Sequence, residues 1–357
     1  MSASPVNRRK FLALGGATAA VAAAAGFGGQ YLQDKRFTVN TGAVHIAQNG
    51  GPALPKGAEI TNIPGLSPFY TPNDQFYRVD TALVIPQVAT SSWQLRIHGM
   101  VDNPMTVSFA DLVRMPMEDH DVTLTCVSEA VGGPYVGNAR WQGTMLAPLL
   151  RKAGVQKGAS QIVMRDVNGM NLGVATDPVL DGRPSMLAIG MNGTALPQQH
   201  GFPVRVVVPG LYGYVSACKW VVDMELTTFA SFSAYWTHRG WSQQAVIKTE
   251  SRIDTPKYGA KLTAGDTTMI AGIAWAQHRG IDAVEVSVDG TWRPAVLATQ
   301  DTVDTWRQWY YPWKATAGRH KIQVRATDKT GYTQTATAQA PEPNGASGYH
   351  TVVVQVA

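Results

Sequence analysis

The C-terminal part of the chain, from about residue 248, has the short alternating pattern of paired β-strands. Residues 284–288 alternate valine with a polar residue, Asp289-Gly290 follows, and Trp292 begins the next segment. An Asp-Gly pair between two such segments is a strong signal for a two-residue hairpin turn. Further strands are expected at 269–275, 307–313, 320–326 and 351–356, with a turn at 328–331. Short strands at this spacing predict a sandwich of two sheets with its own core.

The length of 357 residues leaves room for a second core ahead of this sandwich. A Gly/Pro-rich stretch with weak patterning precedes this N-terminal core and is expected to be a linker. We therefore expect a signal or anchor at 1–29, the linker at 30–62, one domain at 63–247 and the sandwich at 248–357. Charged residues make up only 15% of the chain, which indicates a compact protein and argues against disorder.

The formal net charge of +5 comes mostly from the N-terminal segment. Residues 1–36 hold five Lys or Arg and one Asp, a net of +4, which leaves +1 for the remainder. A remainder so close to neutral gives no support for a nucleic-acid surface.

Cysteine and histidine are sparse and lack the usual metal or haem spacings. The two cysteines, Cys126 and Cys218, form no CxxC or CxxCH motif, and the eight histidines include no HExxH. A disulfide framework, covalent haem and a zinc site are therefore not expected, and no flavin motif is evident.

The N-terminal segment has the pattern of a twin-arginine export signal. Arg8-Arg9-Lys10 is followed by an Ala/Gly-rich apolar run that extends to about Phe27. This pattern predicts an extracytoplasmic protein, in the periplasm or cell envelope. A chance arginine pair before a membrane anchor is the alternative. Because no A-x-A cleavage site is evident, an uncleaved membrane tether also remains open.

The region 63–247 mixes strand and helix signals. Ser108-x-x-Asp111 has the form of a capping box at the start of a short helix, and Gly154 is suited to end a second one. The expected elements are strands at 93–98 and 206–208, helices ending at 114 and 153, and a hairpin at 161–175 that turns at 168–169.

A strand is predicted to place Cys126 at the wall of a cleft. Residues 122–125 are β-branched or aliphatic, and a Gly-Gly-Pro break follows at 132–134. The thiol should therefore follow the carboxyl end of a buried strand, while the stretch from 133 to 141 is expected to form turns. A small buried hydrophobic side chain is the alternative interpretation of an isolated cysteine.

The segment T-C-V-S-E-A-V-G-G-P, with the G-N-A-R-W-Q-G-T-M that follows, resembles the metal-cysteine segment of the sulfite oxidase family of molybdopterin oxidoreductases. The resemblance implies that Cys126 is the only protein ligand of a molybdenum ion held by a single pterin. One soft thiolate is enough, because the pterin dithiolene supplies two further sulfurs. It also implies an α+β chain, with a mixed α/β molybdopterin domain followed by an immunoglobulin-like dimerisation domain.

Two further segments strengthen this resemblance, H-G-F-P-V-R-V-V-V-P-G at 200–210 and T-P-N-D-Q-F-Y at 71–77. Cationic or donor groups at the edges of apolar segments are suited to a buried anion such as the pterin phosphate. The cofactor-binding residues implied by the resemblance are Asp74, Phe76, Tyr77, Arg78, Asp166, His200, Arg205, Ala217, Cys218 and Lys219.

The implied activity is the transfer of an oxygen atom between water and a small substrate, with two electrons passed to an external carrier. Cys126 and Arg78 are the expected catalytic residues, and oxidation of sulfite is the first hypothesis. However, sulfite-oxidising relatives surround the metal with arginines, whereas here Glu129 follows the cysteine and 343–348 contains no arginine. This difference leaves a neutral S- or N-oxide, reduced as by a methionine sulfoxide reductase, as the alternative.

A secreted, non-enzymatic binding module, in which the immunoglobulin-like domain does the binding, is the third hypothesis. A thiol at a strand end next to an anion-binding set argues against it. The expected partners are a small oxyanion or oxide, an external electron carrier and a second copy of the chain bound through the C-terminal domain.

Overall fold

The computed structural model describes residue 44 and residues 51–357 of the chain. The predicted export signal lies outside the described residues, as does most of the predicted linker, and residues 51–62 contain turns but no helix or strand. No helix within the described residues has the length and apolar composition needed to cross a bilayer.

The first sheet joins strands from both ends of the region between residues 94 and 227. Its order is β2-β1-β10-β5-β6, and β1 runs parallel to β10 whereas the other neighbours are antiparallel. The hairpin between β5 and β6 turns at Gly169, whose φ of 82° is readily adopted only by glycine, as predicted. The strands are β1 (Gln94–Gly99), β2 (Met105–Ser108), β5 (Gln161–Asp166), β6 (Asn171–Ala175) and β10 (Val221–Thr227).

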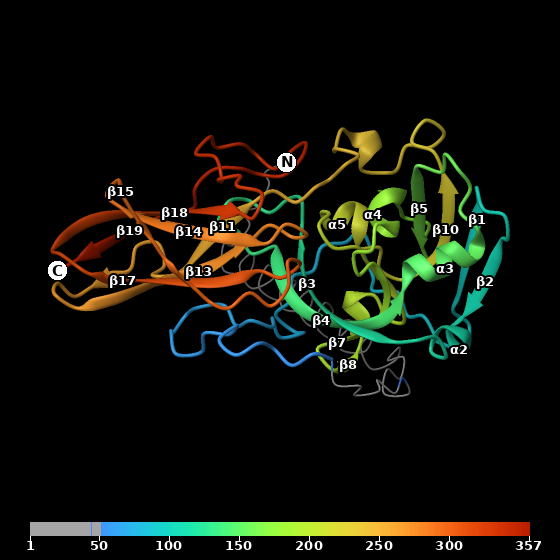
Figure 1. Ribbon diagram of the computed structural model, residues 1–357, viewed down its shortest axis with the longest axis horizontal. Coiled ribbons are helices and arrows are strands. Elements are labelled where there is room, and N and C mark those ends of the chain that lie inside the picture. Colours follow the sequence, from blue (N-terminus) through green and yellow to red (C-terminus); the bar gives the residue numbers. More distant parts are fainter. Residues whose placement is uncertain (1–43, 45–50) are drawn as a thin grey trace, which may run out of the picture. The chain divides into compact units, whose positions relative to one another are not determined.

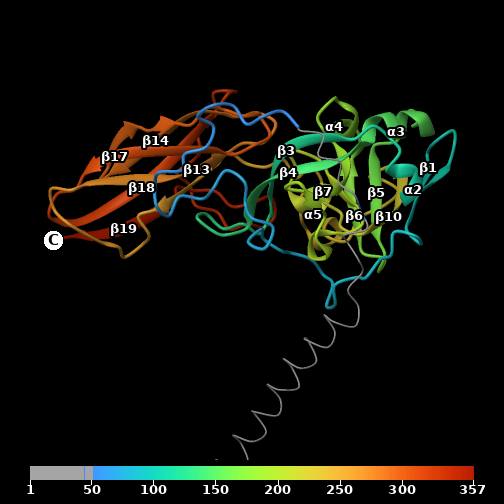
Figure 2. The same cartoon turned by 90° about the horizontal axis from the view of Figure 1, so that it is seen from below.

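The second sheet carries Cys126 at its edge. Its order is β3-β4-β7-β8, β9 also pairs with β7, and all neighbours are antiparallel; Figure 2 shows β3, β4 and β7 side by side. The last residue of β3 is Thr125, so Cys126 follows directly, as predicted. The strands are β3 (Glu118–Thr125), β4 (Val136–Met145), β7 (Met186–Met191), β8 (Thr194–Ala195) and β9 (Arg205–Val207).

The expectation of turns as far as residue 141 is wrong, because β4 begins at Val136 and is paired on both sides. Gly137 and Asn138 are poor strand formers, yet close packing requires them here. A Cβ on Gly137 would lie 2.7 Å from a carbon of the Phe76 ring. The Asn138 amide accepts from Thr123 Oγ1 at 2.9 Å and donates to the Phe69 carbonyl at 2.9 Å.

The helices are short, and the longest described one has eight residues. α2 starts with the predicted capping box, in which Ser108 and Asp111 bond each other's backbone N–H. α3 ends at Gly154, whose left-handed conformation was also predicted. Since most regular structure is strand, the expected α+β class is only loosely met. The helices are α2 (Phe109–Leu112), α3 (Leu146–Ala153), α4 (Thr176–Leu180) and α5 (Gly213–Ser216), with 3₁₀ turns at Gln198–His200 and Thr237–Arg239.

Residues 250–356 form the predicted sandwich, drawn in orange and red in Figure 1. One sheet has the order β11-β13-β17-β16 and the other β12-β19-β18-β14-β15. The strands are β11 (Glu250–Thr255), β12 (Lys261–Leu262), β13 (Thr267–Trp275), β14 (Ile281–Val288), β15 (Thr291–Pro294), β16 (Val296–Leu297), β17 (Arg307–Lys314), β18 (Gly318–Asp328) and β19 (Thr351–Val356).

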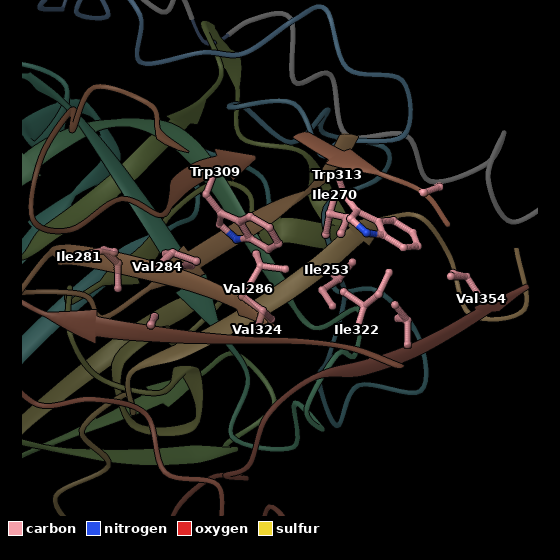
Figure 3. Packing of buried hydrophobic residues seen from close by; sticks show 14 of the residues in the cluster. Ile253, Ile270, Ile281, Val284, Val286, Trp309, Trp313, Ile322, Val324 and Val354 are labelled. Atoms are coloured by element: carbon pink, nitrogen blue, oxygen red, sulfur yellow. The ribbon is translucent and has the colours of Figure 1, made fainter. Parts of the chain in front are cut away.

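The core of the sandwich is filled by side chains of both sheets. Figure 3 shows Trp309 and Trp313 of one sheet packed with Val286, Ile322 and Val324 of the other. The predicted hairpin is present, since the two turn residues after β14 have φ of 51° and 89°, as a two-residue turn with two left-handed positions requires.

Candidate functional site

The thiol of Cys126 lines a cavity of about 290 Å³ in the first domain. The residue is 8% exposed, and its Sγ lies 2.9 Å from Ser128 Oγ. Its backbone N–H donates to the Tyr135 carbonyl at 2.9 Å and so closes residues 126–135 into a compact segment, here named the Cys126 loop. Burial raises the pKa of the thiol, whereas a bound metal cation would act in the opposite direction.

A buried guanidinium faces the same cavity without a counterion. Arg205 is 5% exposed, and its Nη1 donates to the His200 carbonyl at 3.1 Å. Its Nε has no hydrogen-bond partner, and within the described residues it forms no ion pair. Burial lowers the pKa of Arg205 to about 10, which reflects the cost of a desolvated charge.

Two further nitrogen groups flank this cation. The Nε2 of His200 donates to the Asn73 carbonyl at 2.8 Å, and burial lowers the pKa of His200 to about 4, so the ring is neutral. The Nζ of Lys219 lies 2.6 Å from Asp80 Oδ2 and 3.3 Å from the Gln199 carbonyl. Burial lowers the pKa of Lys219 to about 8 despite this ion pair.

This donor set fits the phosphate end of a pterin cofactor. A buried cation with an unpartnered N–H is suited to an anion that brings several acceptor oxygens. His200 offers no competing charge, and Lys219 adds a second cation at the same wall of the cavity. A lone thiol in the same cavity then suits a metal whose other ligands come from the cofactor itself.

An aromatic pair borders the cavity. The rings of Phe76 and Tyr77 are stacked with 5.2 Å between centroids, and both side chains line the cavity. Phe76 meets Trp141 and His200 edge-on at 5.7 and 5.6 Å. Both aromatic rings therefore lie in the wall of the cavity that is also lined by Cys126.

Not all predicted site residues reach the cavity. Ala217, Cys218 and Asp166 line it, but one carboxylate oxygen of Asp166 accepts the N–H groups of the following hairpin turn at 2.8 and 2.9 Å. Asp74 is exposed and does not line the cavity. Arg78 does not line it either, and its Nε pairs with Asp80 at 2.8 Å.

The cavity also has lining residues that lay outside the predicted set. Asp80 supplies the carboxylate that pairs with Lys219. Three aromatic residues, Tyr214, Trp236 and Trp241, also line the cavity and are here named the aromatic corner. The rings of Tyr214 and Trp241 lie 5.9 Å apart. Trp236 and Trp241 lie in a stretch dense in aromatic residues, 235–241, which is the sequence signal that could have found them.

Comparisons with known proteins find matches to both parts of the chain. Residues 82–236 match the family described as oxidoreductase molybdopterin binding domain, and residues 250–324 match the bacterial Ig domain. Mitochondrial sulfite oxidase of Mus musculus is 29% identical over 307 residues, which cover 72% of this chain. The chain spans only 55% of that protein's length.

Two further relatives extend the comparison. The uncharacterized oxidoreductase YuiH of Bacillus subtilis (strain 168) is 32% identical over 151 residues, 42% of this chain and 73% of that protein. The crystal structure of the sulfane dehydrogenase SoxCD from Paracoccus pantotrophus superposes with a TM-score of 0.66 at 23% identity. It covers 81% of this chain and 84% of that one, which shows a shared fold.

Proposed function

Because this chain belongs to the sulfite oxidase family of molybdopterin-dependent oxidoreductases, we propose that it is an enzyme that transfers an oxygen atom between water and a small substrate and passes two electrons to an external carrier. The observation that carries this proposal is a single cavity lined by both the Cys126 thiol and the uncompensated guanidinium of Arg205.

Residues at two walls of the cavity would hold the cofactor. Cys126 would ligate the molybdenum, while Arg205, Lys219 and the Nε2-protonated ring of His200 surround the place suited to the phosphate. The bound group supplies the two-electron redox chemistry. The protein contributes a cavity whose wall carries fixed hydrogen-bond donors.

Sulfite is the first candidate substrate, because sulfite oxidases are among the relatives. A small dianion requires cations near the metal. Apart from Arg205 and Lys219, which are assigned to the phosphate, no Lys or Arg side chain of the described residues lines this cavity.

A neutral S- or N-oxide is the second candidate, favoured by the charge balance of the cavity. Lys219 is paired with Asp80, His200 is neutral, and the aromatic corner presents rings in place of cations. Aromatic walls bind a neutral oxide with an apolar substituent better than they bind a dianion.

Metal and pterin analysis of the exported protein tests the proposal. Wild type should contain about one molybdenum and one pterin per chain, and Cys126→Ser should lose molybdenum, because serine replaces a soft thiolate with a poor ligand. Cys218→Ser is the matched control, since it removes the other thiol of the same cavity. Wild-type protein from a molybdenum-sufficient host that lacks the metal would contradict the proposal.

Steady-state assays then separate the two substrates. Sulfite with an artificial electron acceptor should be turned over in the first case, and methionine sulfoxide with a reduced dye in the second. A micromolar KM for sulfite that rises steeply with salt would retire the neutral oxide, and turnover of the oxide alone would retire sulfite.

We also propose domain boundaries at 62/63 and 247/248 and a dimer contact through the C-terminal domain. Export is proposed to follow the twin-arginine route. Arg8→Lys combined with Arg9→Lys should retain the full chain in the cytoplasm in cell fractionation. Unchanged export of this variant would contradict the signal, and extraction by carbonate washing would contradict the alternative of a membrane tether.

A further inference from the structure

A second, much smaller cavity of about 10 Å³ lies beside the Cys126 loop. The loop residues 129–132 line one side of it, and Glu250 and Trp275 of the second domain line the other. The volume is about that of one water molecule, which needs roughly 10–15 Å³ of such space.

Three buried polar atoms of this wall have no hydrogen-bond partner among the described residues, namely Glu129 Oε1, Glu250 Oε1 and Trp275 Nε1. Their side chains are 6%, 7% and 2% exposed. Buried polar groups in folded proteins are almost always paired, with protein or with ordered water. Three unpaired atoms on side chains around one water-sized cavity therefore point to a missing shared partner.

We infer that one buried water molecule occupies this cavity, accepts a hydrogen bond from Trp275 Nε1 and bonds to both glutamates. A water molecule has two donors and can accept, which matches one N–H and two carboxyl oxygens. A metal ion suits the cavity less well, because an indole N–H is a donor and cannot ligate a cation.

The other oxygen of each glutamate is already bonded within its own domain. Glu129 Oε2 accepts the N–H of Tyr135, and Glu250 Oε2 accepts from Gln334 Nε2 at 3.1 Å. The backbone N–H of Glu129 donates to the Cys126 carbonyl at 3.1 Å. The water thus completes a hydrogen-bonded path from the second domain to the residue that carries the thiol.

The path makes Glu250 and Trp275 positioning residues for Cys126, a role that rests on the proposed function, whereas the water site itself does not. A second contact supports it, since Arg252 Nη1 donates to the Gly133 carbonyl at 2.9 Å. The second domain therefore restrains the Cys126 loop at two places, through Arg252 and through the water.

Trp275→Phe tests the site, because it removes the indole N–H; it also replaces the bicyclic indole with a smaller phenyl ring, so the control must remove the same volume. The matched control is Trp309→Phe, which removes an equally buried and unpartnered indole N–H from the sandwich core, away from this cavity. Hydrogen exchange measured by mass spectrometry on the full-length, cofactor-loaded protein should show roughly tenfold faster exchange in peptide 126–135 for the first variant only.

A high-resolution crystal structure of wild type should show an ordered water within hydrogen-bond distance of the three atoms. An empty cavity, or equal exchange in the two tryptophan variants, would overturn the inference. Glu250→Leu should speed exchange in the same peptide, and Glu250→Gln should restore it because an amide still bonds water. Molybdenum content measured on the same samples separates these outcomes from a failure of the proposed function.

Discussion

The guanidinium carbon of Arg205 lies 4.8 Å from the centroid of the Trp141 ring. An arginine over an aromatic face is partly compensated by the ring electrons, which helps to explain how a buried cation is tolerated without a carboxylate. The remaining free-energy cost of burying this charge should make mutation of Arg205 stabilise the cofactor-free protein but weaken cofactor binding.

Arg205→Met should weaken cofactor binding and at the same time stabilise the cofactor-free protein. In the cofactor-bound protein the phosphate loses its partner, and in the cofactor-free protein an unpaired charge is removed from the interior. Each change in free energy should be on the order of ~1–4 kcal/mol. Molybdenum content and thermal unfolding of cofactor-free samples check the two signs. Arg165→Met is the control, since Arg165 pairs with Asp223 and Glu225 on a part-exposed surface. Unchanged loading would place the phosphate elsewhere.

Cofactor uptake should fall as pH rises through about 8, the lowered pKa of Lys219. The protonated ammonium binds phosphate and the neutral amine does not, so uptake that requires the charge drops roughly tenfold by one pH unit above that pKa. Loading of the cofactor-free protein at pH 7 and pH 9 measures the effect. Lys219→Arg should remove the pH dependence because arginine stays charged, and a wild-type profile without slope would contradict the role.

Acid should destabilise the protein in part through His350. Its Nδ1 accepts the Ile253 N–H at 2.9 Å, and burial, together with Arg252, lowers its pKa from 6.5 to about 4. Between these values the unfolded chain binds a proton that the folded chain does not. The free energy of unfolding should therefore fall with falling pH, by at most ~1.4 kcal/mol per pH unit for this group, and be insensitive to it above pH 6.5.

His350→Asn keeps an acceptor near the Nδ1 position without a titrating ring, so its stability should depend less on pH in that window. The same change at the exposed His238 is the control and should leave the wild-type slope. Denaturant unfolding at pH 7, 5.5 and 4.5 gives the comparison, and parallel curves for wild type and His350→Asn would refute the assignment.

Gly137→Ala should disturb the aromatic pair and destabilise the first domain. The added Cβ would lie 2.7 Å from the Phe76 ring, closer than a methyl group tolerates, at a cost of ~1–3 kcal/mol for overpacking. Gly213→Ala is the control, because its Cβ would meet nothing nearer than 3.7 Å. Thermal unfolding of both variants measures the difference, and equal melting temperatures would contradict the tight packing.

Local chemistry in the sequence predicted much of the fold. The capping box at Ser108, the glycine end of α3 and the Asp289-Gly290 turn depend on a few neighbouring residues, and the structure has all three. β4 was missed because its glycine and asparagine are set by contacts with Phe76 and Thr123, which are distant in sequence. Propensity cannot report such contacts.

The sequence likewise predicted one part of the candidate site and missed another. The set of His200, Arg205 and Lys219 was predicted from the resemblance of its segments to the sulfite oxidase family and because cationic or donor groups at the edges of apolar segments suit a buried anion. All three line one cavity with Cys126. Asp80, Trp236 and Trp241 come from loops and Tyr214 from the short helix α5. Their places are fixed only by tertiary packing, so no periodic pattern marks them. Asp74 was predicted from its segment, but the folded loop turns its side chain to solvent.

The parallel pairing of β1 with β10 constrains when the protein can be assembled during translation. Arg96 of β1 lies opposite Asp223 of β10, and Lys219 comes shortly before that strand. A nascent chain therefore exposes the edge of β1 until its partner has left the ribosome. His200, Arg205 and Lys219 emerge just before that partner strand, and Trp241 is the last described residue that lines the cavity, so all of these residues have been synthesised before nearly the whole C-terminal sandwich.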